Sequence, residues 1–303
     1  MIDFKPLLPG QKQAYSRLLS MADKEGCEYG FVNLYLWGRQ KAALVGQDLV
    51  IFSQYNRKSV YLFPAGPGNK KETLDAIIAD AAKRGIPCRL SGLNQADHAL
   101  LEQLYPGKFT MHFDRDSFDY VYSIDDLADL AGRKYQKKRN HLNRFRSQRP
   151  DHRLEAMTPE NLQLVRALTA RWYESRLQED PMGDFDLEQA ALERAFRHFE
   201  ELELEGLLLW DGDELLAMAI GSFLKEDTFD IHFEKALDRS DGTYAAINQG
   251  FAAWLREKYP DLRYLNREDD MGIEGLRKAK LSYCPDHMVE KSWALLREEA
   301  YDI

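Results

Sequence analysis

Three ionisable residues alternate along the segment 228–234. Asp230, His232 and Glu234 occupy every second position, with phenylalanine or isoleucine between them. Side chains two residues apart point to the same face of a strand, so we expect these three to lie together. Two carboxylates beside an imidazole can take a proton from an attacking amine. We interpret Glu234 as a general base and His232 as a second catalytic residue, although the exposed face of an antiparallel strand would show the same pattern.

A loop that contains glycine joins this strand to a helix predicted over 244–259. Arg239, Gly242 and Thr243 lie between the two elements. Backbone N–H groups at the start of a helix are unpaired and attract phosphate, and Arg239 adds a positive charge. The loop is therefore a candidate site for the phosphates of CoA or tRNA, unless Asp241 simply caps the helix.

The segment 264–285 combines acids and bases over a short distance. It contains three adjacent acids, followed by a predicted helix over 273–282 that carries Arg277 and Lys280 in its later turns. We expect Glu268 and Asp269 to hold a cationic amine, and Arg277 or Lys280 to neutralise a phosphate or an internal acid. The alternative is that acids at the start of a helix and bases at its end complement the helix dipole. An internal ion pair from Glu268 or Asp269 to Arg277 would then fix the helix.

A second charged segment lies earlier, between residues 133 and 149. It contains eight Lys or Arg residues and no acid, in a chain whose formal net charge is -9. A local positive patch on an acidic protein favours an anionic partner such as RNA or a phosphate group. The candidate contacts are Lys137, Lys138, Arg139 and Arg144. Apolar residues recur at helical spacing through the same region, so a helix that exposes its charges to solvent is the alternative.

Composition excludes several classes of protein. The chain has 303 residues, of which 44% are hydrophobic and 30% charged, as in a globular protein. No run of about 18 apolar residues occurs, and residues 1–10 lack the pattern of a signal peptide, so we expect a cytoplasmic protein without a transmembrane helix. The motifs of P-loop NTPases, dinucleotide dehydrogenases and serine hydrolases are absent.

The spacing of the cysteines and histidines argues against a disulfide framework and a zinc site. The three cysteines, Cys27, Cys88 and Cys284, are far apart in the sequence, which favours a reducing compartment over a disulfide framework. None of the seven histidines has the spacing to another histidine or a cysteine that is typical of zinc sites. We therefore expect no metal site.

Two parts of the chain follow the same order of elements. Residues 36–94 and 209–266 each read as three strands, a loop, a helix and a strand, over nearly the same length. This order predicts a duplicated unit of mixed α/β (α+β) structure. The expected domains are 1–124 and 150–303, joined by a basic helical connector over 125–149.

Several motifs resemble a bacterial family of unknown function that is allied to the C-terminal domain of phosphatidylglycerol lysyltransferases. The resemblance covers most of the chain. The motifs are Glu234-Lys235-Ala236, Tyr244 with Ile247-Asn248, the run Asn266–Gly272, the run Gly275–Lys280, Ser282-Tyr283, Pro285 and, in the basic segment, Lys137–His141 with Phe145.

This resemblance implies two tandem acyltransferase folds of the GNAT type. It implies transfer of an acyl group from acyl-CoA, or of an aminoacyl group from aminoacyl-tRNA, onto an amine or hydroxyl of a small molecule or lipid headgroup. No tightly bound cofactor is expected. In this fold the strand ending near Asn266 separates from its neighbour and opens the reaction cleft, with Tyr244, Asn248 and Asn266 as substrate contacts and Tyr283 as a catalytic residue. A non-catalytic protein that binds RNA or an acidic metabolite is the alternative.

Overall fold

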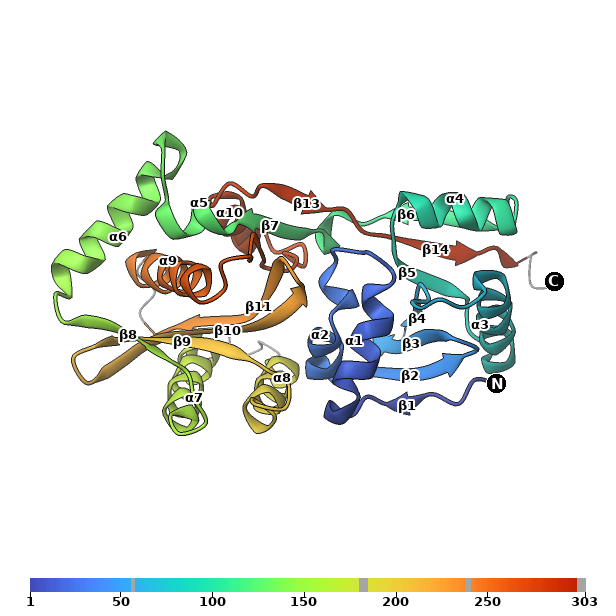
Figure 1. Ribbon diagram of the computed structural model, residues 1–303, viewed down its shortest axis with the longest axis horizontal. Helices are drawn as coiled ribbons and strands as arrows, with labels where there is room; N and C mark the ends of the chain where they lie inside the picture. The colour runs from blue at the N-terminus through green and yellow to red at the C-terminus, as the bar shows by residue number, and fades with distance from the viewer. Residues whose placement is uncertain (56–57, 180–184, 238–240, 299–303) are drawn as a thin grey trace. The chain divides into compact units, whose positions relative to one another are not determined.

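The computed structural model describes residues 1–55, 58–179, 185–237 and 241–298. These residues form two compact units (Figure 1). The first unit comprises Met1–Asp119, Asp269–Gly272 and Val289–Ile303, and the second comprises Tyr120–Glu268 and Ile273–Met288. None of the helices in the described part of the chain combines the length and apolar character needed to cross a bilayer.

The first unit is built on a mixed sheet of seven strands. In spatial order these are β1 (Lys5–Pro6), β2 (Gln40–Val45), β3 (Asp48–Tyr55), β4 (Lys58–Leu62), β5 (Arg89–Leu93), β14 (Ser292–Leu296) and β6 (Phe109–Phe113). Its helices are η1 (Pro9–Gln11), α1 (Lys12–Ser20), η2 (Cys27–Tyr29), α2 (Phe31–Trp37), α3 (Lys70–Arg84), α4 (Gln95–Leu104) and η3 (Arg115–Ser117).

The second unit contains a sheet of the same size. In spatial order its strands are β8 (His152–Ala156), β9 (Glu205–Asp211), β10 (Glu214–Lys225), β11 (Thr228–Ala236), β12 (Tyr264–Asn266), β7 (Asp119–Ser123) and β13 (His287–Val289). Its helices are α5 (Ile124–Asp129), η4 (Arg133–Tyr135), α6 (Gln136–Gln148), α7 (Leu162–Glu179), α8 (Asp186–Arg197), α9 (Asp241–Lys258) and α10 (Glu274–Leu281).

The predicted duplication is confirmed by the order and pairing of these elements. In the first unit β2, β3 and β4 pair antiparallel, and α3 then crosses to β5, which pairs parallel with β4. In the second unit β9, β10 and β11 pair antiparallel, and α9 crosses to β12, which pairs parallel with β11. Both copies are therefore hairpins of three strands followed by one helical crossover.

The unit boundaries differ from those expected at residues 124 and 150. β14 lies in the first sheet between β5 and β6, although it is the last strand of the chain. β7 follows β6 in the sequence but lies in the second sheet beside β12. The segment expected to be a connector is part of the second unit, because Leu127, Leu142 and Phe145 are buried in its core.

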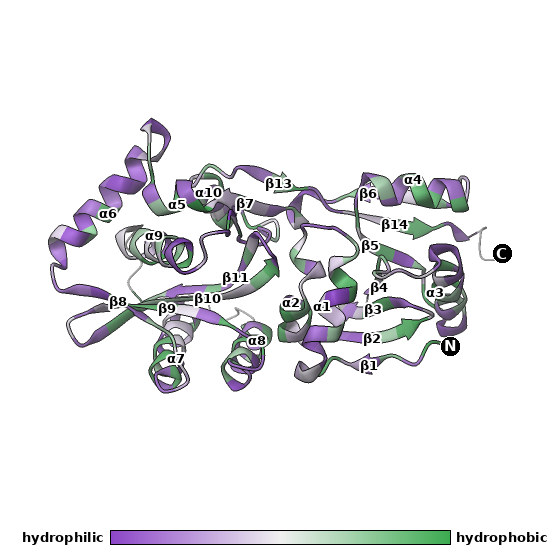
Figure 2. Cartoon of the chain, in the orientation of Figure 1, coloured by the Kyte–Doolittle hydropathy of each residue, from purple (hydrophilic) through white to green (hydrophobic). Residues whose placement is uncertain are grey.

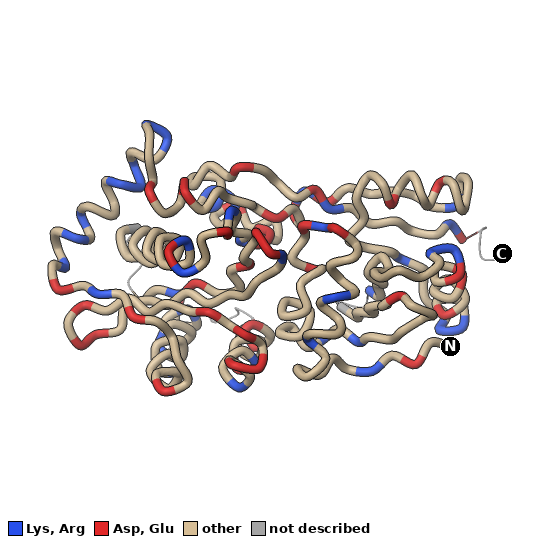
Figure 3. The backbone as a smooth tube through the Cα atoms, viewed as in Figure 1, with Lys and Arg blue, Asp and Glu red and all other residues tan. Residues whose placement is uncertain are grey.

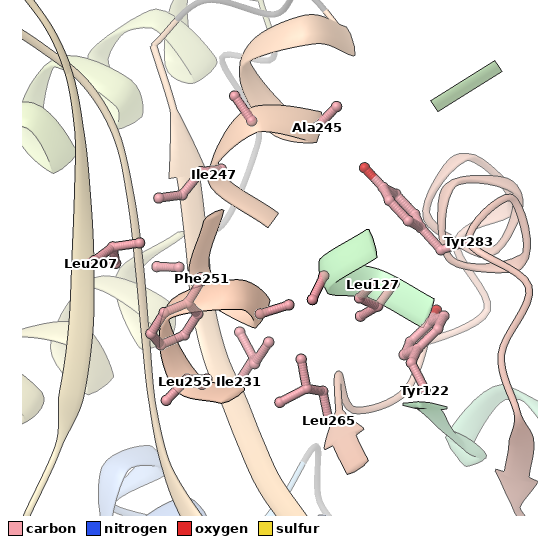
Figure 4. Close-up of a cluster of buried hydrophobic side chains, with 14 of the residues drawn as sticks. Tyr122, Leu127, Leu207, Ile231, Ala245, Ile247, Phe251, Leu255, Leu265 and Tyr283 are labelled. Carbon is pink, nitrogen blue, oxygen red and sulfur yellow. The ribbon is translucent and has the colours of Figure 1, made fainter. Parts of the chain in front are cut away.

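The core of the second unit fills the space between its sheet and α9 (Figure 4). Phe251 of α9 is fully buried and its ring meets that of Phe229 on β11 at a centroid distance of 5.8 Å. Burying one such aromatic side chain contributes about 1.5–3 kcal/mol of free energy of folding. This packing fixes α9 against β11 and so positions the polar side chains that the two elements carry.

Candidate functional site

The strands β11 and β12 separate after only three paired positions. Their parallel pairing ends at Asp230 and Asn266. β11 continues to Ala236, whereas the chain after β12 turns toward β7, where the N–H of Arg267 donates to the carbonyl of Tyr120 at 2.9 Å. Within the described residues, the second half of β11 therefore has no partner strand on this side, as the family resemblance implied for the strand ending at Asn266.

β11 contains a β-bulge next to the position where it stops pairing with β12. In the pairing with β10, Ile231 lies opposite Gly221 and Phe233 opposite Ile220, so His232 is an extra residue in a β-bulge. A side chain at Gly221 would obstruct this geometry, because its Cβ atom would lie 2.1 Å from the carbonyl oxygen of Asp230. The bulge thus depends on a glycine in the neighbouring strand.

The bulge changes which residues of β11 face α9. Before it, Phe229 and Ile231 belong to the core that α9 covers, and after it Ala236 does. Glu234 shares the face of Ala236, since it lies two residues away. The expectation that Asp230, His232 and Glu234 share one face is therefore wrong, and Glu234 belongs to a separate group of side chains.

The first group surrounds Glu234 on the face of α9. Nη2 of Arg267 lies 3.2 Å from Oε1 of Glu234, and Nδ2 of Asn248 on α9 donates to Oε2 at 3.4 Å. The side chains of Arg267 and Glu234 are only 14% and 10% exposed. Burial alone would lower the pKa of Arg267, but the Glu234 carboxylate together with Tyr122 and Tyr283 outweighs burial and raises that pKa above its usual value.

Two polar atoms in this group are not satisfied by the described part of the chain. Nη1 of Arg267 and Oδ1 of Asn248 are buried, and neither makes a hydrogen bond with the described residues. A buried polar atom without a partner costs about 1–3 kcal/mol. One donor and one acceptor beside Glu234 are therefore available to a ligand that carries both kinds of group.

Two tyrosines line the same group. The rings of Tyr122 and Tyr283 lie 5.8 Å and 5.2 Å from the guanidinium carbon of Arg267. Tyr283, expected to be catalytic, is buried, and the ammonium of Lys138 lies 3.8 Å from its ring centroid. Arg267 and Tyr122 were not among the sequence candidates, although Arg267 lies within the motif that follows Asn266.

The second group surrounds His232. Its Nε2 atom lies 2.9 Å from Oγ of Ser222 on β10, and its Nδ1 atom lies 3.2 Å from Oε1 of Glu268 and 3.6 Å from Oδ2 of Asp230. His232 and Asp230 are almost inaccessible, whereas the Glu268 side chain is 18% exposed. Ser222 was not a sequence candidate, because strand pairing alone brings it here.

Asn266 and Lys280, two of the predicted substrate contacts, stabilise the turn that follows β12. Asn266 is fully buried and its Oδ1 accepts the N–H of Glu268 at 2.7 Å. Lys280 is buried too, and its ammonium donates to the backbone carbonyls of Arg267 and Glu268 at 2.6 Å and 3.2 Å. Lys280 thus contacts the backbone of this turn. Glu268 contacts His232.

Asp269 and Arg277 are the other candidates in the segment after β12. Asp269 follows Glu268 in the turn and falls in the first unit, and Arg277 lies half-buried on α10. At the start of α9, Gly242 and Thr243 are buried in the first turn, and Tyr244 packs against the core. Arg239 lies outside the described residues.

The basic residues lie on α6, which is hydrophilic along most of its length (Figure 2) and carries repeated positive charges (Figure 3). Lys137 and Arg144 are exposed. Arg139 has a different role, because its guanidinium donates to the carbonyls of Leu130 and Gly132, directly after α5. Of the four predicted anion contacts, three remain candidates on α6 and Arg139 caps a neighbouring helix.

Comparisons with known proteins bear on the whole chain. A family model described as phosphatidylglycerol lysyltransferase, C-terminal, matches residues 20–295. The crystal structure of a conserved protein of unknown function from Bacteroides thetaiotaomicron VPI-5482 is 36% identical, with a TM-score of 0.90, and the match covers 98% of this chain and 100% of that one.

More distant structures show the same fold. The structure of L-PGS from Bacillus licheniformis has a TM-score of 0.67 at 16% identity, covering 97% of this chain and 93% of that one. A tandem GNAT protein from the clavulanic acid biosynthesis pathway has a TM-score of 0.50 at 10% identity, covering 97% and 98%. The expected tandem GNAT-like fold is thereby confirmed.

One curated relative matches only part of this chain. An uncharacterized protein from Mycoplasmoides gallisepticum is 27% identical over 177 residues, which are 58% of this chain and 55% of that protein. The chain thus spans about half the length of the curated relative that it matches.

Proposed function

Because this chain belongs to the family of phosphatidylglycerol lysyltransferase C-terminal domains, we propose that it transfers an acyl or aminoacyl group onto an amine or hydroxyl acceptor. The donor is aminoacyl-tRNA or acyl-CoA. The acceptor is a small molecule or a lipid headgroup. The family membership supports group transfer in general, and the residues around Glu234 support the particular chemistry.

The observation that carries the proposal is the pair of unsatisfied atoms beside Glu234. Nη1 of Arg267 can donate to a carbonyl oxygen, and Oδ1 of Asn248 can accept from an amine N–H. An aminoacyl group offers both a carbonyl and an amine on adjacent carbons. A ligand that restores both hydrogen bonds recovers the free energy that burial of these atoms costs.

Glu234 contacts both of these side chains and is our candidate for the general base. An attacking amine must lose a proton as it adds to the carbonyl carbon, and a carboxylate in hydrogen-bonding range can accept it. Asn248 and Arg267 orient this carboxylate from two sides. Holding donor and acceptor together supplies most of the remaining rate enhancement, so no covalent nucleophile is required.

One feature favours aminoacyl-tRNA over acyl-CoA as the donor. α6 presents Lys137, Lys138 and Arg144 along a helix, which is more positive charge than one pyrophosphate needs. Gly242 and Thr243 in the first turn of α9 are the candidate contacts for a phosphate of either donor. Tyr283 and Tyr244 are proposed to line the reaction site with Glu234.

The proposal is tested by offering the purified protein a mixture of radiolabelled aminoacyl-tRNAs, or labelled acetyl-CoA, with an amine-containing metabolite mixture or with vesicles of anionic and aminated phospholipids. We expect label to transfer to one acceptor class. In Glu234→Gln the rate should fall about 10²–10⁴-fold with donor binding retained.

Glu274→Gln is the matched control, because that carboxylate is 80% exposed on α10 and should leave the rate unchanged. Tight binding of tRNA without transfer to any acceptor would instead identify a non-catalytic RNA-binding protein. Full activity in Glu234→Gln would place the base elsewhere.

A further inference from the structure

Three side chains of metal-binding type converge in the second unit. Asp230 and His232 come from β11 and Glu268 follows β12, and one ligand atom from each lies within 4.8 Å of the other two. The Nδ1 atom of His232 is 3.2 Å from Glu268 and 3.6 Å from Asp230. Ligands about 2.1 Å from a tetrahedral zinc ion lie about 3.4 Å from one another, so these separations fit one shared ion.

The second nitrogen of His232 is held in the manner of a metal ligand. Nε2 lies 2.9 Å from Oγ of Ser222, in range to donate its hydrogen to the hydroxyl. In that tautomer Nδ1 carries the lone pair and faces the two carboxylates. Histidines that bind metals commonly donate their other N–H to a neighbouring oxygen, which fixes the ring orientation. The competing arrangement is a proton on Nδ1 that donates to Glu268.

The first unit contains a comparable cluster of side chains of metal-binding type. Cys27, Glu28 and Asp119 also converge within 4.8 Å. There the ammonium of Lys291 lies among them, 2.6 Å from Asp119, 2.7 Å from Glu28 and 3.4 Å from the Cys27 sulfur. That cluster already holds a cation from the chain itself.

In the second unit, Lys280 is a lysine near the cluster, and its contacts differ from those of Lys291. The ammonium of Lys280 donates to the backbone carbonyls of Arg267 and Glu268. The Arg267 guanidinium pairs with Glu234, which belongs to the other group. Lys280 and Arg267 thus each contact oxygens outside the three side chains of this cluster.

We propose that Asp230, His232 and Glu268 bind one divalent transition-metal ion, with Zn²⁺ as the preferred occupant. One nitrogen and two carboxylate oxygens suit zinc, and three protein ligands leave a fourth position open. An ion there would lie where β11 and β12 separate and would act as a Lewis acid. This inference goes beyond the proposed transfer reaction, and metal binding is measured without any substrate.

The test is titration calorimetry of the full chain, stripped with EDTA and dialysed, against Zn²⁺, Mn²⁺ and Mg²⁺ separately. We expect one Zn²⁺ per chain, weaker Mn²⁺ binding and no Mg²⁺ binding. His232→Ala and Glu268→Gln should each weaken Zn²⁺ binding more than about 100-fold, and Ser222→Ala about 10–100-fold, as for residues that orient a ligand.

The matched control is His198→Gln. Nδ1 of His198 lies 3.0 Å from Glu201, and among the described residues His198 belongs to neither cluster of metal-binding type, so its loss should leave Zn²⁺ affinity unchanged. Circular dichroism of each variant separates loss of binding from loss of fold. If a variant unfolds, the visible spectrum of Co²⁺ bound to the unaltered protein, and its loss on adding Zn²⁺, reports on the same site.

Absence of Zn²⁺ binding by the unaltered protein at about 100 μM metal would overturn the proposal. The proposal would also be overturned if folded His232→Ala bound Zn²⁺ as tightly as the unaltered protein does. The structure would then contain an internal hydrogen bond from protonated Nδ1 to Glu268. Either result can occur whether or not group transfer is observed, so the two proposals fail independently.

Discussion

The guanidinium of Arg267 donates to Glu234 at 3.2 Å, which connects β11 to the turn after β12 at the level where the two strands no longer pair. Strand pairing cannot hold these segments together beyond Asn266. The ion pair does so, and it is largely buried. Removing one charge therefore affects both the stability of the second unit and the orientation of the Glu234 carboxylate.

Arg267→Met should lower the free energy of unfolding by about 3–5 kcal/mol, because it leaves the Glu234 carboxylate buried without its partner. Urea unfolding measures the change. Lys278→Met is the control: Lys278 pairs with Glu274 at 2.6 Å on α10, but both side chains are at least 74% exposed. Its loss should change stability by less than about 1 kcal/mol. If the two variants lost the same stability, the ion pair of Arg267 and Glu234 would be solvated.

Gly221→Ala should disrupt the bulge at His232. The added Cβ atom would lie 2.1 Å from the carbonyl of Asp230, so β10 or β11 must move, at a cost of at least about 2 kcal/mol. In Gly275→Ala the new Cβ atom meets no atom within 4 Å, and α10 should be unchanged or stabilised by up to about 1 kcal/mol. Thermal unfolding of the two variants gives the comparison. Equal melting temperatures would contradict the assigned register.

Arg139 and Lys137 should respond differently to replacement by alanine. Arg139→Ala removes hydrogen bonds to the carbonyls of Leu130 and Gly132 and should cost about 1 kcal/mol of stability. Lys137→Ala should leave stability unchanged and reduce the salt dependence of tRNA binding by about one unit of slope, because one phosphate contact is lost. Unfolding curves and binding at several salt concentrations distinguish the two roles, and identical behaviour would refute this division.

Cys88 should resist alkylation while Cys284 reacts. Burial raises the pKa of the Cys88 thiol from 9.0 to about 12, and the thiolate is the reactive form. Cys284 is only half-buried. Iodoacetamide treatment at pH 8 followed by peptide mass spectrometry measures both sites. Rapid labelling of Cys88 would show that the first unit opens readily.

The same pKa shift has a consequence for stability. Between pH 9 and about 12 the unfolded chain loses the Cys88 proton that the folded chain retains. The free energy of unfolding should therefore fall as pH rises through this window, and the contribution is fully present below pH 9. Cys88→Ala should remove this part of the alkaline loss in urea unfolding measured across the window.

The order of elements was predictable because its signals are local. Asp211-Gly212 between two apolar runs predicted the turn from β9 to β10, and Gly212 has the positive φ of 54° that such a turn requires. Partners distant in the sequence have no local signal. Nothing near residue 292 indicates that this strand pairs with Leu93 and Phe113, so the unit boundaries could not be read from the chain.

The site was predictable only in part for a similar reason. Alternation along β11 identified Glu234 and His232, but the bulge that separates them depends on Gly221 in another strand. A glycine within an apolar strand is a known sign of a bulge and was the available signal. The proposed ligands Asp230 and His232 lie on β11 and Glu268 lies in the turn after β12, so spacing rules for short metal motifs could not detect the set.

The position of β14 also governs when the first unit can finish folding. On the ribosome, β5 and β6 emerge early, but the strand that belongs between them is made only after nearly all of the second unit. At typical rates of synthesis this delay is on the order of 10–30 s. During it two strand edges lack their partner and are open to pairing with other nascent chains. Slow translation should therefore increase aggregation, and the first unit should acquire its native structure after the second.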